Sequence, residues 1–174
     1  FDFCSRILEF SMTSPDASYT GPPAILDHDL NRHFPELLKF ESTPEMEASE
    51  LYKQIRPEVE KILNAVVVQS AGFSPSPPRK QAETCTLNAL AWNIERGNRF
   101  EGIIDALKTH EELNNKDVYL LTELDYGMAR SGNRFVAQEI ADELKLNYAF
   151  APVYVALQKG SGVESEMEGE NTRS

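Results

Sequence analysis

The sequence predicts an α/β fold with parallel strands, preceded by a helical extension. Short apolar runs alternate with helical periodicity over residues 87–155, and a strand, a helix and a second strand within residues 87–123 indicate a βαβ unit. Residues 1–80 differ, because they combine a loop at residues 11–31 with a helical pattern and a proline-rich linker. We therefore expect an N-terminal loop and helical extension, followed by an α/β domain over residues 81–174.

The extension is expected to hold two helices. A short helix is predicted over residues 35–40, and a longer one starts with Thr43 as N-cap and Pro44 at the first helical position. Pro57 should kink this longer helix or divide it in two. Residues 72–80 include three prolines and are predicted to form a linker or a tight surface crossing. The apolar residues at helical spacing in the longer helix are Tyr52, Ile55, Val59, Ile62, Leu63, Val66 and Val67.

The α/β domain opens with a strand, a helix and a strand. Residues 87–94 form an apolar run that predicts a strand buried on both faces. Asn98 and Glu101 have the spacing of a capping box at the start of a helix. Residues 117–123 predict a second buried strand. The apolar face of the intervening helix consists of Phe100, Ile103, Ile104 and Leu107.

A third cycle follows along the chain. Asn133 is predicted to cap a helix, and residues 147–155 are predicted to form the next strand. Residues 160–174 are polar, acidic and glycine-containing, which indicates a mobile, solvated loop. The expected inner face of the helix is Val136, Ile140, Ala141 and Leu144, and the acids of the loop are Glu164, Glu166, Glu168 and Glu170.

Composition limits the partners. The 174-residue chain carries 28 acidic and 17 basic residues, a formal net charge of −11, so nucleic acid is a partner that the charge does not support. No apolar run is long enough to predict a transmembrane span. Residues 1–12 make a poor signal peptide, and we expect a cytoplasmic protein. Cys4 and Cys85 are widely separated, which fits free buried thiols better than a disulfide framework or a zinc site.

Two polar side chains close the first two strands. Asn93 and Glu123 should lie side by side at the carboxyl edge of a parallel sheet, where ligands of open α/β sheets bind. A carboxylate in this place can bind a hard cation such as Mg²⁺, act as an acid or base, or pair with an arginine. An amide beside it can bond a phosphate oxygen, although Asn93 could also simply cap the next turn. The chemistry at this edge therefore stays open on spacing alone.

Further charged residues surround this edge. Asp125 lies on the Glu123 side if the strand continues, and there it could orient Glu123 without contacting the metal itself. Arg130 and Arg134 are candidate phosphate contacts, but salt bridges to the domain's many acids are favoured for both. Glu95 should point the other way, and is expected to be solvated or paired with Arg96.

Two sequence runs at the strand ends are similar to a known superfamily. They are Leu-Ala-Trp-Asn93-Ile-Glu-Arg-Gly97 and Leu-Leu-Thr-Glu123-Leu-Asp125-Tyr-Gly127, separated by one helix. In order, spacing and strand-end placement they resemble the opening motifs of the endonuclease/exonuclease/phosphatase superfamily. The stretch Met-Ala-Arg130-Ser-Gly-Asn133-Arg134 looks like that of one bacterial branch, and the resemblance covers residues 86–171.

The resemblance implies a fold and a metal site. It implies the first half of a four-layer α/β/β/α sandwich, with the C-terminal half missing. In that family the residue matched by Glu123 is a Mg²⁺ ligand (Mn²⁺ could replace it), and the one matched by Asn93 organises the metal and the scissile phosphate. The later motifs of the family, including the Asp-His pair that activates water, have no counterpart here, and the three histidines of the chain do not replace them.

The resemblance also implies a function. The intact parent is expected to be a divalent-metal-dependent hydrolase of phosphodiester or phosphomonoester bonds, and this chain alone is expected to be inactive. The alternative is a non-catalytic member of the same fold that only binds or packs, or an inactive truncated product, because one fold hosts many functions. No residue selects among lipid, nucleotide, inositol phosphate and nucleic acid as the substrate class.

Overall fold

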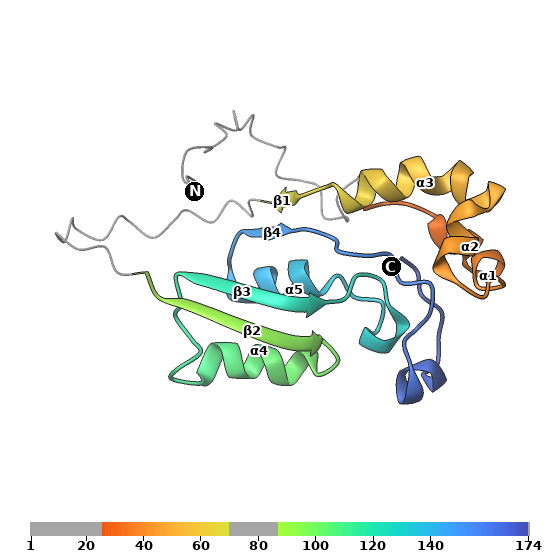
Figure 1. The fold of residues 1–174 in the computed structure, drawn as a ribbon. Helices are drawn as coiled ribbons and strands as arrows, with labels where there is room; N and C mark the ends of the chain where they lie inside the picture. Colours follow the sequence, from red (N-terminus) through yellow and green to blue (C-terminus); the bar gives the residue numbers. More distant parts are fainter. Residues whose placement is uncertain (1–25, 70–86, 174) are drawn as a thin grey trace, which may run out of the picture.

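The computed structural model describes residues 26–69 and 87–173, and Figure 1 shows an α/β arrangement of helices and two small sheets. The expectations for Cys4, Cys85, residues 1–12 and residues 72–80 fall outside the described residues. The elements, in chain order, are the 3₁₀ helix η1 (Leu30–His33), α1 (Phe34–Leu37), α2 (Thr43–Ala48), α3 (Glu50–Leu63), β1 (Val67–Gln69), β2 (Ala89–Arg96), α4 (Phe100–Thr109), β3 (Val118–Leu124), η2 (Ala129–Ser131), α5 (Val136–Leu144), β4 (Tyr148–Phe150) and η3 (Gly162–Glu166).

The long predicted helix is divided at Ser49, and Pro57 lies inside α3. Ser49 has an extended backbone, and its hydroxyl accepts a hydrogen bond from the Tyr52 amide at 3.1 Å, so it ends α2 and caps α3. Ser42, not Thr43, caps α2 in the same way, with its hydroxyl 3.4 Å from the amide of the third helical residue. The predicted division at Pro57 was therefore wrong, because Ser42 and Ser49 supply the start signals of the two helices, and a kink at Pro57 stays a prediction.

The end of this helical region also differs from the prediction. α3 ends at Leu63, and Val66 and Val67 lie beyond it. Val67 instead begins the unpredicted strand β1, which pairs antiparallel with β4 in the register Val67↔Phe150. The predicted strand at residues 147–155 is therefore shortened to three residues and joins β1, not the parallel sheet. Strands this short carry too little periodicity to be found in the sequence.

β2 and β3 pair in parallel, as the βαβ pattern predicts, with Ala89 opposite Val118 and Asn93 opposite Thr122. The register becomes irregular between Asn93 and Arg96, where β2 bulges. Figure 1 shows α4 running along β2 and α5 lying behind β3.

Both predicted asparagine caps in this part were wrong. Arg99 occupies the N-cap of α4 and Phe135 that of α5, and neither cap makes a side-chain hydrogen bond. Asn133 has a left-handed backbone with φ of 57°, and its side chain donates to the carbonyl of Glu170 at 3.0 Å. It therefore ties the C-terminal loop to the domain, while α5 starts without side-chain capping.

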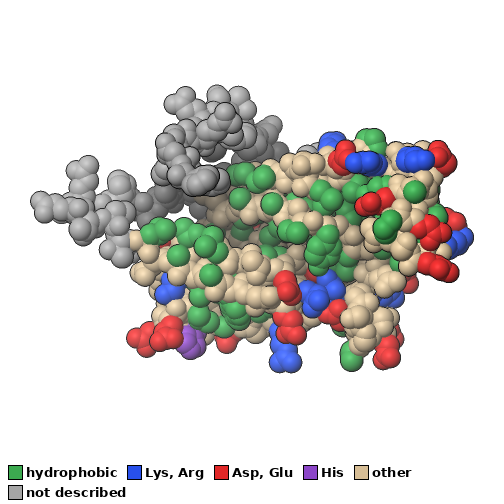
Figure 2. All heavy atoms as spheres, in the orientation of Figure 1, with side chains coloured by type: hydrophobic (Ala, Val, Ile, Leu, Met, Phe, Trp, Pro, Cys, Tyr) green, Lys and Arg blue, Asp and Glu red, His purple; other side chains and the backbone are tan. Residues whose placement is uncertain are grey.

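The β2–β3 sheet is covered on one face. Helices α4 and α5 bury that face in a core made of Ile94, Phe100, Ile103, Ile104, Leu107, Val136 and Ile140. Side chains on the other face are exposed within the described part of the chain, among them Ala91, Asn93, Leu120 and Thr122. Figure 2 shows apolar side chains along this open side. The expectation of strands buried on both faces was therefore wrong for the residues that the structure describes.

A second core joins the N-terminal helices to α5. It consists of Leu26, Leu30, Phe34, Leu37, Ile55, Val59, Ile62, Val67, Phe135 and Ala137. Phe135 makes edge-to-face contacts with Tyr126, Tyr148 and Phe150, at centroid distances of 4.8, 5.7 and 5.1 Å. Residues 26–69 therefore pack directly on the α/β part. Among the described helices, none has the length and hydropathy needed to cross a membrane.

Candidate functional site

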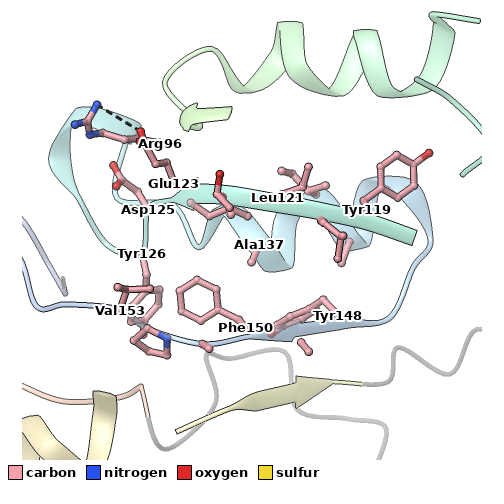
Figure 3. Close-up of a pocket in the computed structure, with 18 of the residues that line it drawn as sticks. Arg96, Tyr119, Leu121, Glu123, Asp125, Tyr126, Ala137, Tyr148, Phe150 and Val153 are labelled. Carbon is pink, nitrogen blue, oxygen red and sulfur yellow. Dashed lines mark ion pairs between the residues drawn. The ribbon is translucent and has the colours of Figure 1, made fainter. Parts of the chain in front are cut away.

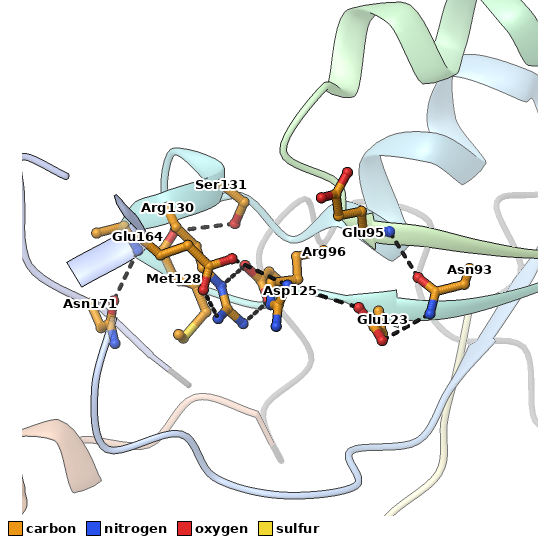
Figure 4. A network of polar contacts seen from close by, with 11 residues as sticks. Asn93, Glu95, Arg96, Glu123, Asp125, Met128, Arg130, Ser131, Glu164 and Asn171 are labelled. Atoms are coloured by element: carbon orange, nitrogen blue, oxygen red, sulfur yellow. Dashed lines mark hydrogen bonds and ion pairs between the residues drawn. The ribbon is translucent and has the colours of Figure 1, made fainter. Parts of the chain in front are cut away.

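Asn93 and Glu123 meet at the carboxyl ends of β2 and β3, as the parallel arrangement predicts (Figure 4). The Asn93 side-chain amide donates to Oε1 of Glu123 at 2.8 Å. Asn93 also caps the turn that follows β2, because its Oδ1 accepts from the Glu95 amide at 3.0 Å. The capping interpretation of Asn93 is therefore confirmed, its amide also fixes the Glu123 carboxylate relative to the bulge, and its role towards a phosphate oxygen stays a prediction.

The backbone around this pair is unusual. Glu95, Arg96 and Glu123 have φ values of 50°, 66° and 57°, in the left-handed region that non-glycine residues rarely adopt. Such residues cost about 1–3 kcal/mol each and gather at functional sites. Gly97 continues the turn with φ of 80°, and a Cβ there would lie 2.8 Å from the Val136 side chain. The fold thus holds both strand ends in a strained geometry directly beside the polar pair.

The Glu123 carboxylate is accessible and faces one cation. Its side chain is 46% exposed, and Oε2 lies 4.0 Å from Nη1 of Arg96. It stands at one end of a groove of about 830 Å³, whose walls are β3 and the segment that includes β4 (Figure 3). Helix α5 contributes Ala137, which lies between these walls in Figure 3. A mostly apolar groove with a carboxylate at its end is a typical ligand site.

Asp125 and Arg130 form a buried ion pair just beyond β3. Both carboxylate oxygens of Asp125 accept from Arg130, from Nε and from Nη2, at 2.8 Å each. The two side chains are only 7% and 5% exposed. The hydrogen bonds from Arg130 to Asp125 raise the pKa of Arg130 above its ordinary value, and the nearby Glu164 acts in the same direction. Asp125 is therefore engaged with Arg130 and positions it.

Arg134 is engaged by other acids. Its guanidinium pairs with Glu139 at 2.6 Å and with Glu101 at 3.2 Å, and stacks over the Phe100 ring at 4.4 Å. Salt bridges to the domain's acids, the favoured interpretation of Arg130 and Arg134, are what the structure shows.

Sequence reasoning missed Glu164 and underrated Arg96. Glu164 was expected to be solvated, but one of its oxygens lies 3.1 Å from Arg96 and the other 3.2 Å from Arg130. Figure 4 shows this carboxylate between the two guanidinium groups. Glu95, in contrast, is exposed and directed away from Glu123, because β2 bulges between Asn93 and Arg96 and Glu95 has a left-handed backbone, whereas regular alternation would place residues 93 and 95 on the same face. No local pattern links Arg96, Arg130 and Glu164, because only the tertiary fold brings them together.

The described residues supply few metal ligands. Within them, no cluster of three or more His, Cys, Asp or Glu side chains is placed to hold an ion. Glu123 nevertheless fits one position of a magnesium site, because Mg²⁺ keeps most of its waters and takes one or two protein carboxylates with substrate phosphates. Asn93 fits the role of orienting that carboxylate.

Comparisons with known proteins do not place the chain in a family. No protein-family model, curated protein or solved structure matches it at a significant level. Function must therefore be inferred from the site itself.

Proposed function

We propose that the chain belongs to a divalent-metal-dependent phosphoesterase that hydrolyses phosphodiester or phosphomonoester bonds. The single observation that supports this most is the 2.8 Å contact between Asn93 and Glu123 at the carboxyl ends of two parallel strands. We further propose that β2, α4, β3 and α5 are the first half of a four-layer α/β/β/α sandwich, which the sequence motifs resemble.

In this proposal each residue has one task. Glu123 holds Mg²⁺ or Mn²⁺, and the bound ion supplies charge neutralisation at the phosphate and the leaving oxygen. Asn93 keeps the Glu123 carboxylate in place through its amide. Asp125 holds Arg130 in the buried pair beside the site. None of these residues is proposed to remove the proton from the attacking water, and this step needs a separate general base.

Metal titration tests the proposal. Calorimetric binding of Mn²⁺ and Mg²⁺ should weaken at least about tenfold in Glu123→Gln, because the swap keeps the shape and removes the charge that attracts a hard cation. Glu95→Gln is the matched control, since it removes an exposed carboxylate at the neighbouring strand end that is directed away from Glu123. Equal metal affinity in wild type and Glu123→Gln would show that Glu123 is structural.

A non-catalytic binding protein is the second candidate function. It is favoured by the small ligand set, since the described residues include no group of three or more His, Cys, Asp or Glu side chains placed to hold a metal ion. A folded protein that binds neither Mg²⁺ nor Mn²⁺ in the same titration would support this alternative.

A further inference from the structure

The most informative contact outside the Asn93–Glu123 pair is the bridge formed by Glu164. Its two carboxylate oxygens are divided between two guanidinium groups, Arg96 at 3.1 Å and Arg130 at 3.2 Å. The Glu164 side chain is 20% exposed, so the bridge is largely screened from water. Two guanidinium groups converging on an anion are the usual protein donors for phosphate oxygens.

Each arginine is held in place by its own surroundings. Arg130 is fixed by both oxygens of Asp125, in a pair that is almost fully buried. The backbone of Arg96 is fixed by the left-handed bulge at the end of β2, and its guanidinium lies 3.1 Å from Glu164 and 4.0 Å from Glu123. The Nε of Arg96 is buried and has no hydrogen-bond partner among the described residues. Preorganised donors of this kind bind anions without reorganisation.

We propose that Arg96 and Arg130 form the phosphate-binding site of the candidate catalytic centre, and that Glu164 occupies this site as an intramolecular competitor. The inference deepens the proposed function and rests on it for the identity of the anion. A phosphate held here would lie next to Glu123, whose carboxylate is 4.0 Å from Arg96. The contact of Glu164 is thus autoinhibitory.

Charge balance explains why Glu164 would exclude phosphate. With Glu164 in place, three carboxylates (Glu123, Asp125 and Glu164) surround two guanidinium groups. Without it, two carboxylates face two guanidinium groups, and the local repulsion of an anion is reduced. Phosphate and Glu164 also require the same donor atoms, so their binding is mutually exclusive.

The chain on the C-terminal side of η3 is held by contacts that do not involve Glu164. Glu164 lies on η3, beside Val163, which is 80% exposed. The chain after η3 is anchored separately, because the Ala129 amide donates to Asn171 at 2.9 Å and the Thr172 amide donates to Gly127 at 2.8 Å. Release of Glu164 therefore leaves those anchors in place.

Binding of inorganic phosphate, without any divalent metal, tests this inference separately from hydrolysis. At fixed ionic strength, calorimetry or ³¹P NMR titration should show that Glu164→Gln binds phosphate between about 5-fold and 150-fold more tightly than wild type, the usual range for coupled equilibria. Glu166→Gln is the matched control, because it removes an equal charge from an exposed position of the same 3₁₀ helix. Adding Arg96→Gln to Glu164→Gln should abolish the gain.

A second pair of variants displaces Glu164 without changing its charge. A Cβ at Gly160 would collide with the Glu164 side chain, whereas a Cβ at Gly162 meets nothing within 4 Å, and both glycines have positive φ. Gly160→Ala should therefore raise phosphate affinity and Gly162→Ala should not.

Equal phosphate binding by folded Glu164→Gln and Glu166→Gln would overturn the inference. Loss of folding in both Glu164→Gln and Gly160→Ala would also overturn it, because Glu164 would then be an obligatory structural bridge. Tight phosphate binding without Mg²⁺ or Mn²⁺ binding would instead sink only the proposed function.

Discussion

Two polar pairs stand two residues apart at the end of β3, and they have opposite environments. The Asn93–Glu123 pair is exposed, with a carboxylate that is 46% accessible. The Asp125–Arg130 pair is buried, with side chains 7% and 5% exposed and two 2.8 Å hydrogen bonds. An exposed pair adds little stability but leaves its charge available to a ligand. The charges of a buried pair have lost their hydration, so removal of one partner leaves an uncompensated buried charge and destabilises the fold. The comparison separates a carboxylate that is accessible to a ligand from a pair whose burial makes it part of the scaffold.

The largest expected effect comes from breaking the buried pair. Asp125→Ala leaves the Arg130 guanidinium without its main partner in a nearly dry place, and should lower the free energy of unfolding by about 3–5 kcal/mol. Urea denaturation measures this change. Asp105→Ala removes an exposed carboxylate from α4 and should change stability by less than about 0.5 kcal/mol. A similar small change for Asp125→Ala would show that the ion pair is dispensable.

A smaller effect is expected at the exposed pair. Asn93→Ala removes the hydrogen bonds to Glu123 and to the Glu95 amide, and should cost about 1–2 kcal/mol, as for the loss of a capping side chain. The same denaturation assay applies. Asn98→Ala is the control, because Asn98 has a capping-box spacing in sequence but Arg99 holds the N-cap of α4. If Asn98→Ala costs as much as Asn93→Ala, the hydrogen bonds of Asn93 are not what stabilises this turn.

These two asparagines show what the sequence can and cannot predict. The parallel pairing of β2 and β3 and the meeting of Asn93 with Glu123 were predictable, because strand–helix–strand periodicity dictates both. The helical faces of α4 and α5 were predictable for the same reason. Which asparagine caps a turn was not predictable, because the choice depends on tertiary hydrogen bonds such as the one from Asn133 to Glu170.

The contacts of Glu164 and the burial of Asp125 were not predictable from the sequence for a similar reason. Glu164 lies in an acidic stretch that resembles a solvated loop, and its contacts are with residues 68 and 34 positions earlier, namely Arg96 and Arg130. The composition of the residues around Glu164 does not predict contacts with residues so far away in the sequence. The burial of Asp125 could not be predicted either, because the sequence around an acidic residue at a strand end does not show whether its side chain is buried or exposed.

A pH dependence of stability is expected from another buried polar group, His28. Burial lowers the pKa of His28 below 6.5, with the charge of Arg173 adding to the effect. The neutral ring accepts a hydrogen bond from the Leu30 amide at 3.3 Å. The unfolded state therefore takes up a proton first, and stability should fall as pH decreases from about 6.5 towards the folded-state pKa. Thermal melts between pH 7.5 and 5 should show a shallower slope in His28→Gln than in wild type, a range set around the unperturbed pKa of about 6.5.

The smallest effect on stability is expected for Glu123→Gln. This variant tests directly whether the exposed pair differs from the buried pair in its contribution to folding. The substitution keeps the acceptor for the Asn93 amide and removes a charge from an exposed side chain, so the free energy of unfolding should change by less than about 0.5 kcal/mol. Arg96 remains paired with Glu164 at 3.1 Å, so no buried cation is left unpaired. Denaturation of Glu123→Gln and Asp125→Asn side by side gives the test, since both replace a carboxylate by an amide of the same shape. A loss in Glu123→Gln as large as that in Asp125→Asn would mean that Glu123 belongs to the scaffold, and that its charge is held for folding and not for a ligand.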